Sequence, residues 1–268
     1  MNKMKILSGA DLADYIKVRQ IGQARALRQA DGINPKLAIV VVKQDPVIET
    51  YVRLKKNYGA DIFVDVDIYK VSQNEAIETI KKLNSDKGIH GIIVQLPLED
   101  ISQTDQVINT IAPEKDVDGL GEKAAFDPAT PTAINWLLAG YNIDIKDKKI
   151  AIIGNGRLVG KPLYDMWSKA GYDVETIEKD DDFLTCLKNK ELIIAATGQP
   201  GIVKSQVVPI ESIVVDAGVA SDSGKTVGDV DQDVYERDDI TITPRVGGVG
   251  PLTVAALFDN VIRAARSK

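Results

Sequence analysis

Short apolar runs alternate with helix-forming segments along the whole chain. LAIVVV, DIFVDVDIY and HGIIVQL come first, and segments with helical periodicity separate them. Because parallel strands need long crossover connections, this order predicts a parallel sheet covered by helices. The pattern starts again after Pro131 with KIAIIG, DVETI, ELIIAAT and SIVVDAG. The sequence therefore predicts an α/β protein made of two α/β domains.

Local signals predict where two helices begin and end. Asp45 before Pro46 is typical of an N-cap followed by proline at the first helical position, and Gly59 is predicted to end that helix. Ser72 and Glu75 have the spacing of a capping box, which predicts the start of the next helix.

The domain boundary is predicted in the loop near residues 119–131. The first domain is expected to comprise residues 1–121 and a last helix, residues 252–268, that returns to it. Residues 122–251 are expected to form the second domain. Within it, TPRVGGVGP is rich in Gly and Pro and predicts a loop before the last helix.

Composition argues against several classes of function. The formal net charge is −6 over 268 residues, whereas nucleic-acid binders usually have a basic surface, so a small-molecule partner is expected. One cysteine, Cys186, and one histidine, His90, cannot form an internal disulfide or a zinc site of Cys and His ligands, so no metal is expected. No apolar run approaches the ~20 residues that span a bilayer. With no signal-peptide pattern at the N-terminus, we expect a cytoplasmic protein without a membrane partner.

A glycine-rich segment, Gly154-Asn155-Gly156-Arg157-Leu158-Val159-Gly160, follows one predicted strand and opens a helix. Glycines at such a turn let the backbone approach a pyrophosphate, and the helix N-terminus favours its negative charge. The spacing is GxGxxxG rather than GxGxxG, so a tight turn without a ligand is an alternative. Glu178, at the end of the next strand, is placed to bind a ribose diol and repel a 2′-phosphate, which favours NAD over NADP. Alternatively, residues 178–182 form a solvated charged loop.

Tyr51 and Lys55 are four residues apart on a predicted helix, so they share one face. A lysine beside an apolar wall can have a lowered pKa and carry a proton near neutral pH. Packing and a surface charge are the alternative explanation for such a pair, and Lys56 is a second candidate for the lysine role.

Four further segments, HGIIVQLPL, PEKDVDG, VGDV and TPRVGGVGPLT, accompany the Tyr51–Lys55 pair and the glycine turn in a characteristic order. Over nearly its whole length the chain resembles the bifunctional methylenetetrahydrofolate dehydrogenase/cyclohydrolase family. The resemblance implies a folate-facing domain, a Rossmann-like dinucleotide-binding domain and a cleft between them. It further implies oxidation of 5,10-methylenetetrahydrofolate with NAD or NADP, hydrolysis of the methenyl product to 10-formyltetrahydrofolate, and a homodimer.

The resemblance also implies roles for individual residues. The implied catalytic residues are Lys55, Tyr51, Gln95 and Asp118, of which Asp118 anchors the pterin. Further implied substrate contacts are Val94, Leu96, Pro97, Gly247, Gly248 and Pro251. Together with the glycine turn and Glu178, the implied cofactor contacts are Thr197, Gly198 and Val219.

The sequence departs from the family pattern chiefly at the cofactor side. Asn155 and Gly156 stand where the family usually has Arg-Ser, and Glu178-Lys179 stands where it usually has His-Ser. Because those groups help to hold the 2′-phosphate of NADP in relatives, NAD is favoured, although Arg157 could still reach a phosphate. The alternatives are a monofunctional NAD-dependent dehydrogenase, a more distant amino-acid or shikimate-type dehydrogenase, and a catalytically silent folate- or nucleotide-binding protein.

Overall fold

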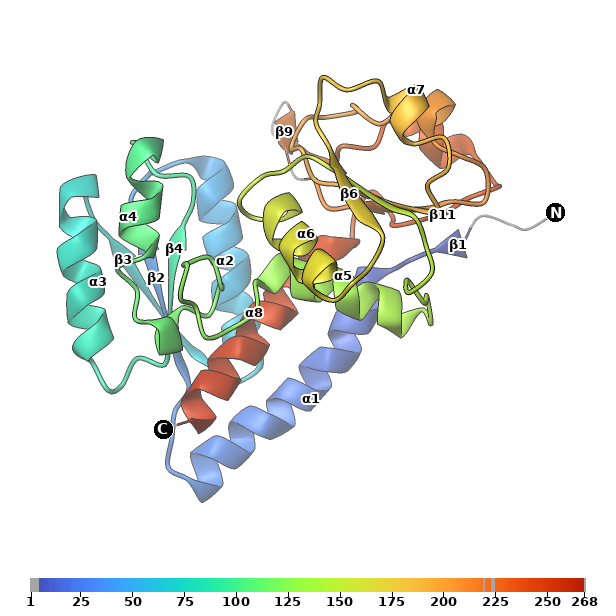
Figure 1. Cartoon of the computed structure of the whole chain (residues 1–268). Coiled ribbons are helices and arrows are strands. Elements are labelled where there is room, and N and C mark those ends of the chain that lie inside the picture. Colours follow the sequence, from blue (N-terminus) through green and yellow to red (C-terminus); the bar gives the residue numbers. More distant parts are fainter. Residues whose placement is uncertain (1–4, 219, 223–224, 268) are drawn as a thin grey trace. The chain divides into compact units, whose positions relative to one another are not determined.

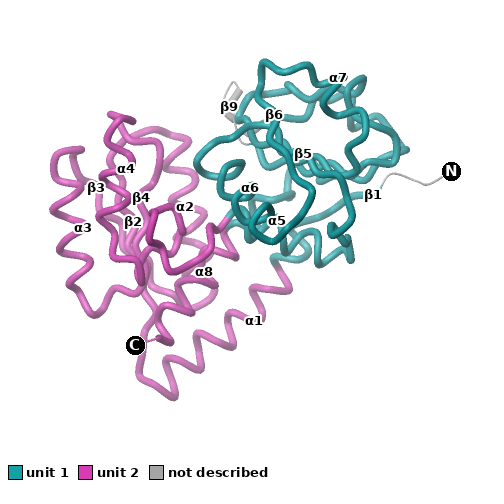
Figure 2. The backbone as a smooth tube through the Cα atoms, in the orientation of Figure 1, with its two compact units in different colours: residues 1–13, 130–253 teal, residues 14–129, 254–268 magenta. Residues whose placement is uncertain are grey.

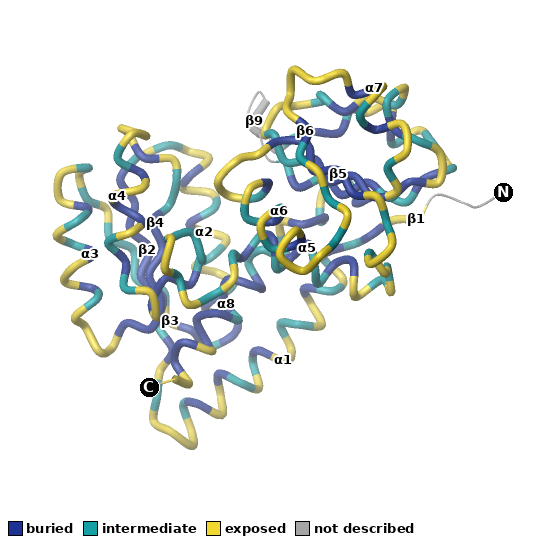
Figure 3. The backbone as a smooth tube through the Cα atoms, viewed as in Figure 1, coloured by how far each residue is buried: buried dark blue, intermediate teal, exposed yellow. Residues whose placement is uncertain are grey.

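The computed structural model describes residues 5–218, 220–222 and 225–267, and the chain divides into two compact units (Figure 2). Unit 1 comprises residues 1–13 and 130–253, and unit 2 comprises residues 14–129 and 254–268. Figure 1 shows the helices and strands of each unit, and Figure 3 shows that the central strands of both main sheets are largely buried. Within the described residues, no helix has the length and apolar character needed to cross a membrane.

Unit 2 is built on a three-stranded parallel sheet in the order β3–β2–β4, as the sequence predicts. The strands are β2 (Lys36–Val41), β3 (Asp65–Lys70) and β4 (Gly91–Gln95), and η1 (Gln73–Glu75) leads into the second crossover helix. The helices of this unit are α2 (Pro46–Asp61), α3 (Ala76–Ser85), α4 (Thr104–Ile108), most of α1 (Gly9–Ala30) and most of α8 (Val249–Arg266). In Figure 1, α3 and α4 lie on one side of this sheet, and α2 and α8 lie on the other.

The start of α2 is confirmed and its predicted end is wrong. Asp45 caps the helix, because its Oδ1 accepts a hydrogen bond from the Val47 N–H at 2.8 Å. The helix continues past Gly59 to Asp61. A Cβ at Gly59 would lie 2.8 Å from the Val64 carbonyl oxygen, so this glycine permits close packing of α2 against the segment leading to β3 instead of ending the helix. The capping box of Ser72 and Glu75 is confirmed, and it opens η1.

Unit 1 contains a six-stranded sheet in the order β1–β11–β8–β7–β5–β6, and every pairing in it is parallel. Its strands are β1 (Lys5–Ile6), β5 (Ile150–Ile153), β6 (Val174–Ile177), β7 (Leu192–Ala195), β8 (Ile213–Asp216) and β11 (Thr241–Ile242). Its helices are α5 (Ala129–Gly140), α6 (Gly160–Lys169) and α7 (Phe183–Cys186), with a short hairpin of β9 (Ala220–Asp222) and β10 (Lys225–Val227). Because β6 and β7 flank β5 on opposite sides, the chain reverses direction across the sheet there, which is where such sheets bind ligands.

The unit boundaries differ from the expected ones at the N-terminus and near the middle of the chain, whereas most of the last helix returns to unit 2 as expected. Residues 1–13 belong to unit 1, because β1 pairs with β11 and adds an edge strand to its sheet. The boundary near the middle lies at residues 129–130, eight residues later than expected, because Asn260 of α8 holds this loop to unit 2. The Asn260 side-chain amide donates to the carbonyl oxygens of Val117 and Asp127 at 3.0 and 3.1 Å. The last helix begins at Val249, inside the segment predicted as a loop.

Candidate active site

Lys55 is the lysine of α2 that reaches another functional side chain. Its Nζ donates a hydrogen bond of 2.8 Å to the Gln95 Oε1, whereas Lys56 is exposed. Tyr51 lies one helical turn before Lys55 and is half-buried. The geometry therefore favours Lys55 over its neighbour for the predicted role.

Burial and charge set the protonation of Lys55 and Asp118 together. Burial lowers the pKa of Lys55, and the negative charge of Asp118 opposes that shift. Burial raises the pKa of Asp118 to about 6, while the positive charge of Lys55 opposes that shift and the charge of Asp116 adds to it. Because each group perturbs the other, the ammonium and the carboxylate lie within electrostatic reach. Unit 2 thus brings together three predicted catalytic residues, Lys55, Gln95 and Asp118.

Gln95 owes its position to the end of a central parallel strand. It is the last residue of β4, where its Cα pairs with that of Val41, and its Nε2 donates to the Leu96 carbonyl oxygen at 3.2 Å. Side chains alternate between the two faces of a strand, so Val94 points to the opposite face. Val94 is 4 % exposed and packs in the hydrophobic core with residues of α3 and α4. The structure therefore does not bring the Val94 side chain to Lys55, while Leu96 is half-buried and Pro97 exposed just beyond Gln95.

The KDVDG segment contains two structural residues beside the candidate pterin anchor. Lys115 is buried, and its Nζ donates to the carbonyl oxygens of Leu83, Asn84 and Asp86 at 2.7 to 2.9 Å. These carbonyls lie at the C-terminus of α3, where a positive charge is favourable. The Asp116 carboxylate accepts backbone N–H groups of Gly119 and Gly121 at 3.1 and 2.8 Å and so shapes the turn.

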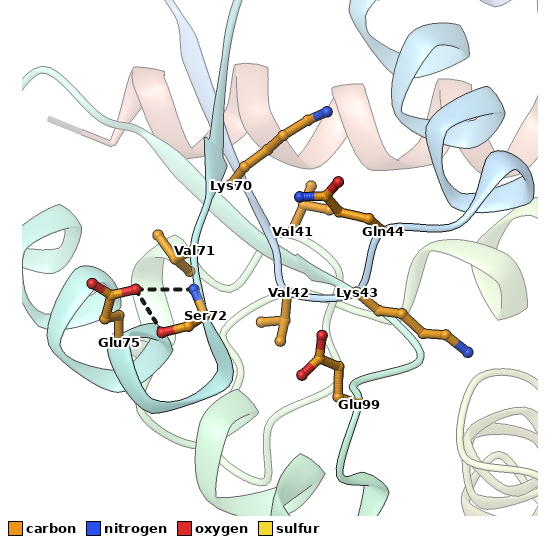
Figure 4. Close-up of a pocket in the computed structure, with 9 residues that line it drawn as sticks. All are labelled: Val41, Val42, Lys43, Gln44, Lys70, Val71, Ser72, Glu75 and Glu99. Atoms are coloured by element: carbon orange, nitrogen blue, oxygen red, sulfur yellow. Dashed lines mark hydrogen bonds between the residues drawn. The ribbon is translucent and has the colours of Figure 1, made fainter.

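An open cavity of about 700 Å³ lies at the carboxyl ends of β2 and β3 (Figure 4). Its charged lining residues include Lys43, Lys70, Glu75 and Glu99, but Lys55, Gln95 and Asp118 do not line it. The Lys43 and Lys70 side chains point in different directions in Figure 4, and Glu75 already accepts hydrogen bonds from Ser72. The charges do not converge on one ligand position, so we assign this cavity no role.

The glycine turn after β5 has the form that a dinucleotide site needs. Gly154 has φ of 94°, and a Cβ there would lie 2.7 Å from the Ala196 carbonyl oxygen. A Cβ at Gly160 would collide with the Gly154 carbonyl oxygen, so both glycines are required by the turn itself. At Gly156 a Cβ would meet only the Ala196 carbonyl oxygen, at 4.0 Å, so the fold leaves open space there. The residue before α6, Val159, makes no side-chain cap, but the Lys161 N–H already donates to the Gly156 carbonyl oxygen at 3.1 Å and Pro162 has no N–H. What favours an anion here is therefore the dipole of this ten-residue helix rather than a row of free amides.

The other predicted cofactor residues of unit 1 lie at the same edge of its sheet. The Gly154 N–H donates to the Ile177 carbonyl oxygen at 2.8 Å, which places the exposed Glu178 directly beside the turn. Asn155 and Arg157 are exposed in the turn, and Thr197 and Gly198 follow the neighbouring strand β7. Val219 lies outside the described residues. These side chains and backbone groups fit a nicotinamide dinucleotide along the carboxyl edge.

The glycines of the TPRVGGVGP segment also lie in unit 1. Gly247 has φ of 85°, and its carbonyl oxygen accepts the Ala10 N–H at 2.9 Å, so the loop is bound to the first turn of α1. Gly248 precedes α8, and Pro251 lies in its first turn. The Arg245 guanidinium lies 5.7 Å from the centre of the Tyr235 ring.

Two carboxylates at this edge, one half-buried and one fully buried, were missed as site residues. Asp216 ends β8, and Asp229 lies in the VGDV segment with no exposed surface. The available signal was an aspartate flanked by apolar residues and glycine, in VDAG and in VGDV. Such an aspartate can survive burial only with hydrogen-bond donors around it.

The fold and these geometries define an α/β enzyme of the class that binds a nicotinamide dinucleotide on a Rossmann-type sheet. Residues 7–118 match the family described as tetrahydrofolate dehydrogenase/cyclohydrolase, catalytic domain. Residues 128–268 match the NAD(P)-binding domain of the same family. The chain belongs to the tetrahydrofolate dehydrogenase/cyclohydrolase family, which confirms the resemblance identified from its motifs.

Relatives match the chain from end to end. The bifunctional protein FolD of Campylobacter jejuni strain RM1221 is 34% identical over 99% of both chains, and that of Hydrogenobaculum is 36% identical over 99% of this chain and 100% of its own. The crystal structure of the Campylobacter jejuni FolD enzyme has a TM-score of 0.91 at 34% identity and covers 98% of this chain and 99% of its own. A Trypanosoma brucei FolD structure complexed with NADP cofactor and inhibitor has a TM-score of 0.92 at 26% identity, covering 100% of this chain and 99% of its own. The predicted two-domain α/β fold is therefore confirmed.

Proposed function

We propose that the chain oxidises 5,10-methylenetetrahydrofolate with a nicotinamide dinucleotide and hydrolyses the methenyl product to 10-formyltetrahydrofolate, using Lys55 for the hydrolysis. The observation that carries this proposal is the 2.8 Å hydrogen bond between Lys55 and Gln95, combined with burial that lowers the pKa of Lys55. A bound dinucleotide supplies the hydride acceptor for the oxidation. The remaining steps depend on how this chain holds the substrate and moves a proton.

Lys55 serves the hydrolysis as a neutral amine. The methenyl group is cationic, so its charge and the buried setting both favour loss of the ammonium proton. Water adds to the methenyl carbon, and one of its protons passes to the Lys55 Nζ. The bond from that carbon to N5 then breaks as N5 takes up a proton from the Lys55 ammonium, and the remaining hydroxyl proton passes to solvent as the carbonyl forms, which leaves the formyl group on N10 and releases one proton overall. Gln95 accepts a hydrogen bond from Lys55 and orients the amine without adding charge.

Asp118 serves both reactions by holding the pterin. A carboxylate accepts two hydrogen bonds from the amino-pyrimidine edge, which fixes the orientation of the ring. Tyr51, Leu96 and Pro97 are proposed as further substrate contacts, since all three lie next to Lys55 or Gln95 on their elements. The backbone of Gly247, Gly248 and Pro251 is proposed to contact the folate as well.

Paired lysine variants test the catalytic assignment. Lys55→Met should reduce the rate of methenyl hydrolysis by about 10²–10⁴-fold, the usual contribution of a positioned acid–base group. Lys56→Met removes the same charge from the next, exposed position and should leave the rate near that of the unmodified protein. Hydrolysis followed by the loss of methenyl absorbance measures both, and a Lys55→Met enzyme with near-normal hydrolysis would reject the role.

We further propose that NAD is preferred over NADP. Glu178 is exposed beside the Gly154 turn, where its carboxylate is placed to accept the ribose hydroxyls and repel a 2′-phosphate. Asn155 and Gly156 offer no cationic group to compensate. Initial rates at equal concentrations of the two dinucleotides test this preference, and a clear advantage for NADP would refute it. Glu178→Ser should reduce the preference for NAD over NADP, whereas Glu175→Ser, on the strand that precedes Glu178, should not.

Assembly and location complete the proposal. We expect a homodimer that acts on soluble tetrahydrofolate derivatives in the cytoplasm. Light scattering across a concentration series measures the dimer directly, and a single monomer mass at all concentrations would contradict it.

A further inference from the structure

Asp229 fixes the turn that follows β7 in unit 1. Its Oδ2 accepts the backbone N–H of Thr197, the Thr197 hydroxyl at 2.9 Å and the Gly198 N–H at 3.2 Å. Three donors converging on one fully buried oxygen call for an ionised carboxylate, which only accepts hydrogen bonds. The position of Thr197 and Gly198 therefore depends on the charge of one side chain from a distant segment of the sequence.

Asp216 fixes Asp229 in turn. The Asp216 Oδ1 accepts the N–H groups of Asp229 and Gly218 at 3.1 and 3.0 Å, and its Oδ2 accepts the Val230 N–H at 3.1 Å. A Cβ at Gly218 would collide with the Asp229 carboxylate, and a Cβ at Gly228 would collide with that of Asp216. The two carboxylates and the two glycines form one interlocked clamp.

The turn held by this clamp lies against the glycine turn. A Cβ at Gly154 would lie 3.1 Å from the Thr197 Cα, and β5 pairs directly with β7 up to Ile153 and Ala195. A shift of the residues after β7 would therefore reach the Gly154 turn through direct contact. Both turns lie at the point where the chain reverses across the sheet, which is the place for a dinucleotide.

We propose that Asp229 is a positioning residue for the dinucleotide: by holding Thr197 and Gly198, it sets the edge against which the cofactor binds. This inference rests on the proposed place of the dinucleotide at residues 154–160. Burial raises the pKa of Asp229, and the hydrogen bonds from residues 197–199 oppose that shift, so the turn and the ionised carboxylate stabilise each other.

The two activities of the chain allow a sharp test. Asp229→Asn keeps the size of the side chain and removes the charge that strengthens its hydrogen bonds. The Kd and KM for the dinucleotide should rise on the order of tenfold, with a smaller change in kcat at saturation. Hydrolysis of the methenyl substrate without dinucleotide, whose proposed catalytic residues Lys55 and Gln95 lie in unit 2, should be unchanged. Asp238→Asn removes an exposed charge from the same unit and should leave the Kd for the dinucleotide unaltered.

A second pair of variants keeps the test valid if Asp229→Asn unfolds unit 1. Thr197→Val removes one donor to Asp229, whereas Thr197→Ser retains it, so the valine variant should bind the dinucleotide more weakly than the serine variant. Wild-type Kd values for both Asp229→Asn and Thr197→Val would overturn the inference. An equal loss of dehydrogenase and hydrolase activities in Asp229→Asn, together with equal Kd values for the two Thr197 variants, would overturn it too.

Gly156→Glu separates this inference from the proposal on which it rests. The fold has space for a Cβ at Gly156, and the new carboxylate would repel a pyrophosphate there. Retained dinucleotide binding in Gly156→Glu would refute the proposed place of the cofactor. Lost binding in Gly156→Glu with normal binding in Asp229→Asn would refute only the positioning role.

Discussion

The two units use buried carboxylates in opposite ways. In unit 1, Asp216 and Asp229 each accept three hydrogen bonds from nearby backbone or hydroxyl groups. In unit 2, burial and the charges of Lys55 and Asp116 set the pKa of Asp118, and no hydrogen bond within the described residues contributes. A carboxylate that accepts several hydrogen bonds from its own fold serves the fold, whereas one balanced only by charge keeps its lone pairs for a ligand.

Among the carboxylates of the two units, the largest expected effect is at Asp118, the one proposed to bind a ligand. Asp118→Asn replaces one acceptor oxygen with an amide donor. One hydrogen bond to the amino-pyrimidine edge would be lost, and the new amide N–H would face an N–H of the pterin. The kcat/KM of both reactions should fall by about 10²–10³-fold, since an unpaired buried polar group discriminates strongly. Steady-state kinetics with the two folate substrates measure the fall.

The neighbouring aspartate is the matched control for that prediction. The Asp116 carboxylate accepts two backbone N–H groups of its own turn, so Asp116→Asn should lower stability more than it changes kcat/KM of the folded enzyme. Equal kinetic losses for the two variants would remove the distinction between a ligand carboxylate and a structural one.

The next effect concerns stability and the other buried charge of the same segment. Lys115→Met would leave the carbonyl oxygens of Leu83, Asn84 and Asp86 without their common donor. The free energy of unfolding should fall by about 2–4 kcal/mol, because removing one partner of a buried charged group is costly. Urea denaturation measures the change. Lys82→Met breaks only an exposed pair with Glu78 and should cost less than about 1 kcal/mol.

Sequence alone predicted the elements whose signals are local. The strand runs, the Asp45 cap and the Ser72 capping box all depend on neighbouring residues, and the structure confirms them. By contrast, β1 has two residues and pairs with β11 at the far end of the chain, so no local pattern distinguishes it. The units divide at residues 129–130, within the predicted loop 119–131, but the position inside that loop depends on Asn260 contacting residues 117 and 127, which no local pattern reveals.

The candidate site shows the same limit. The resemblance to the family implied Lys55 together with Gln95 and Asp118, whose side chains lie within hydrogen-bonding or electrostatic reach of Lys55, and it also implied Val94. Strand alternation buries Val94 in the core on the opposite face. The resemblance named Asp118 alone in the KDVDG segment, but the structural roles of Lys115 and Asp116 were not predicted, because they depend on backbone groups that these side chains meet only in the folded chain.

A smaller effect tests whether the charge of the neighbouring side chain, rather than the hydrogen bond alone, controls the protonation of Lys55. Gln95→Glu would place a carboxylate against the Lys55 Nζ, which raises the pKa of the amine and keeps it protonated. A rise of about one pKa unit would reduce methenyl hydrolysis near neutral pH roughly tenfold, with recovery at higher pH. Gln95→Met removes the hydrogen bond without adding charge and should not move the pH profile upward. An unshifted profile for Gln95→Glu would mean that the protonation of Lys55 does not limit hydrolysis.

The smallest expected effect is a change in stability at Asp118. Here the substitution is expected to raise the free energy of unfolding rather than lower it. Burial raises the pKa of Asp118 to about 6 from an ordinary value of 3.8, so the folded protein must hold an unfavourable charge above that pH. Asp118→Asn is neutral at every pH and should therefore be more stable than the unmodified protein at pH 8. The gain should be about 1–2 kcal/mol, because each pKa unit corresponds to about 1.4 kcal/mol and partial exposure screens the charge.

As the pH falls through about 6 toward 4, Asp118 takes up its proton and the gain should disappear. Urea denaturation across that pH range, with the exposed Asp127→Asn as a control, measures the trend. A gain in stability that persists unchanged at pH 4 would show that the charge of the Asp118 carboxylate does not destabilise the folded protein.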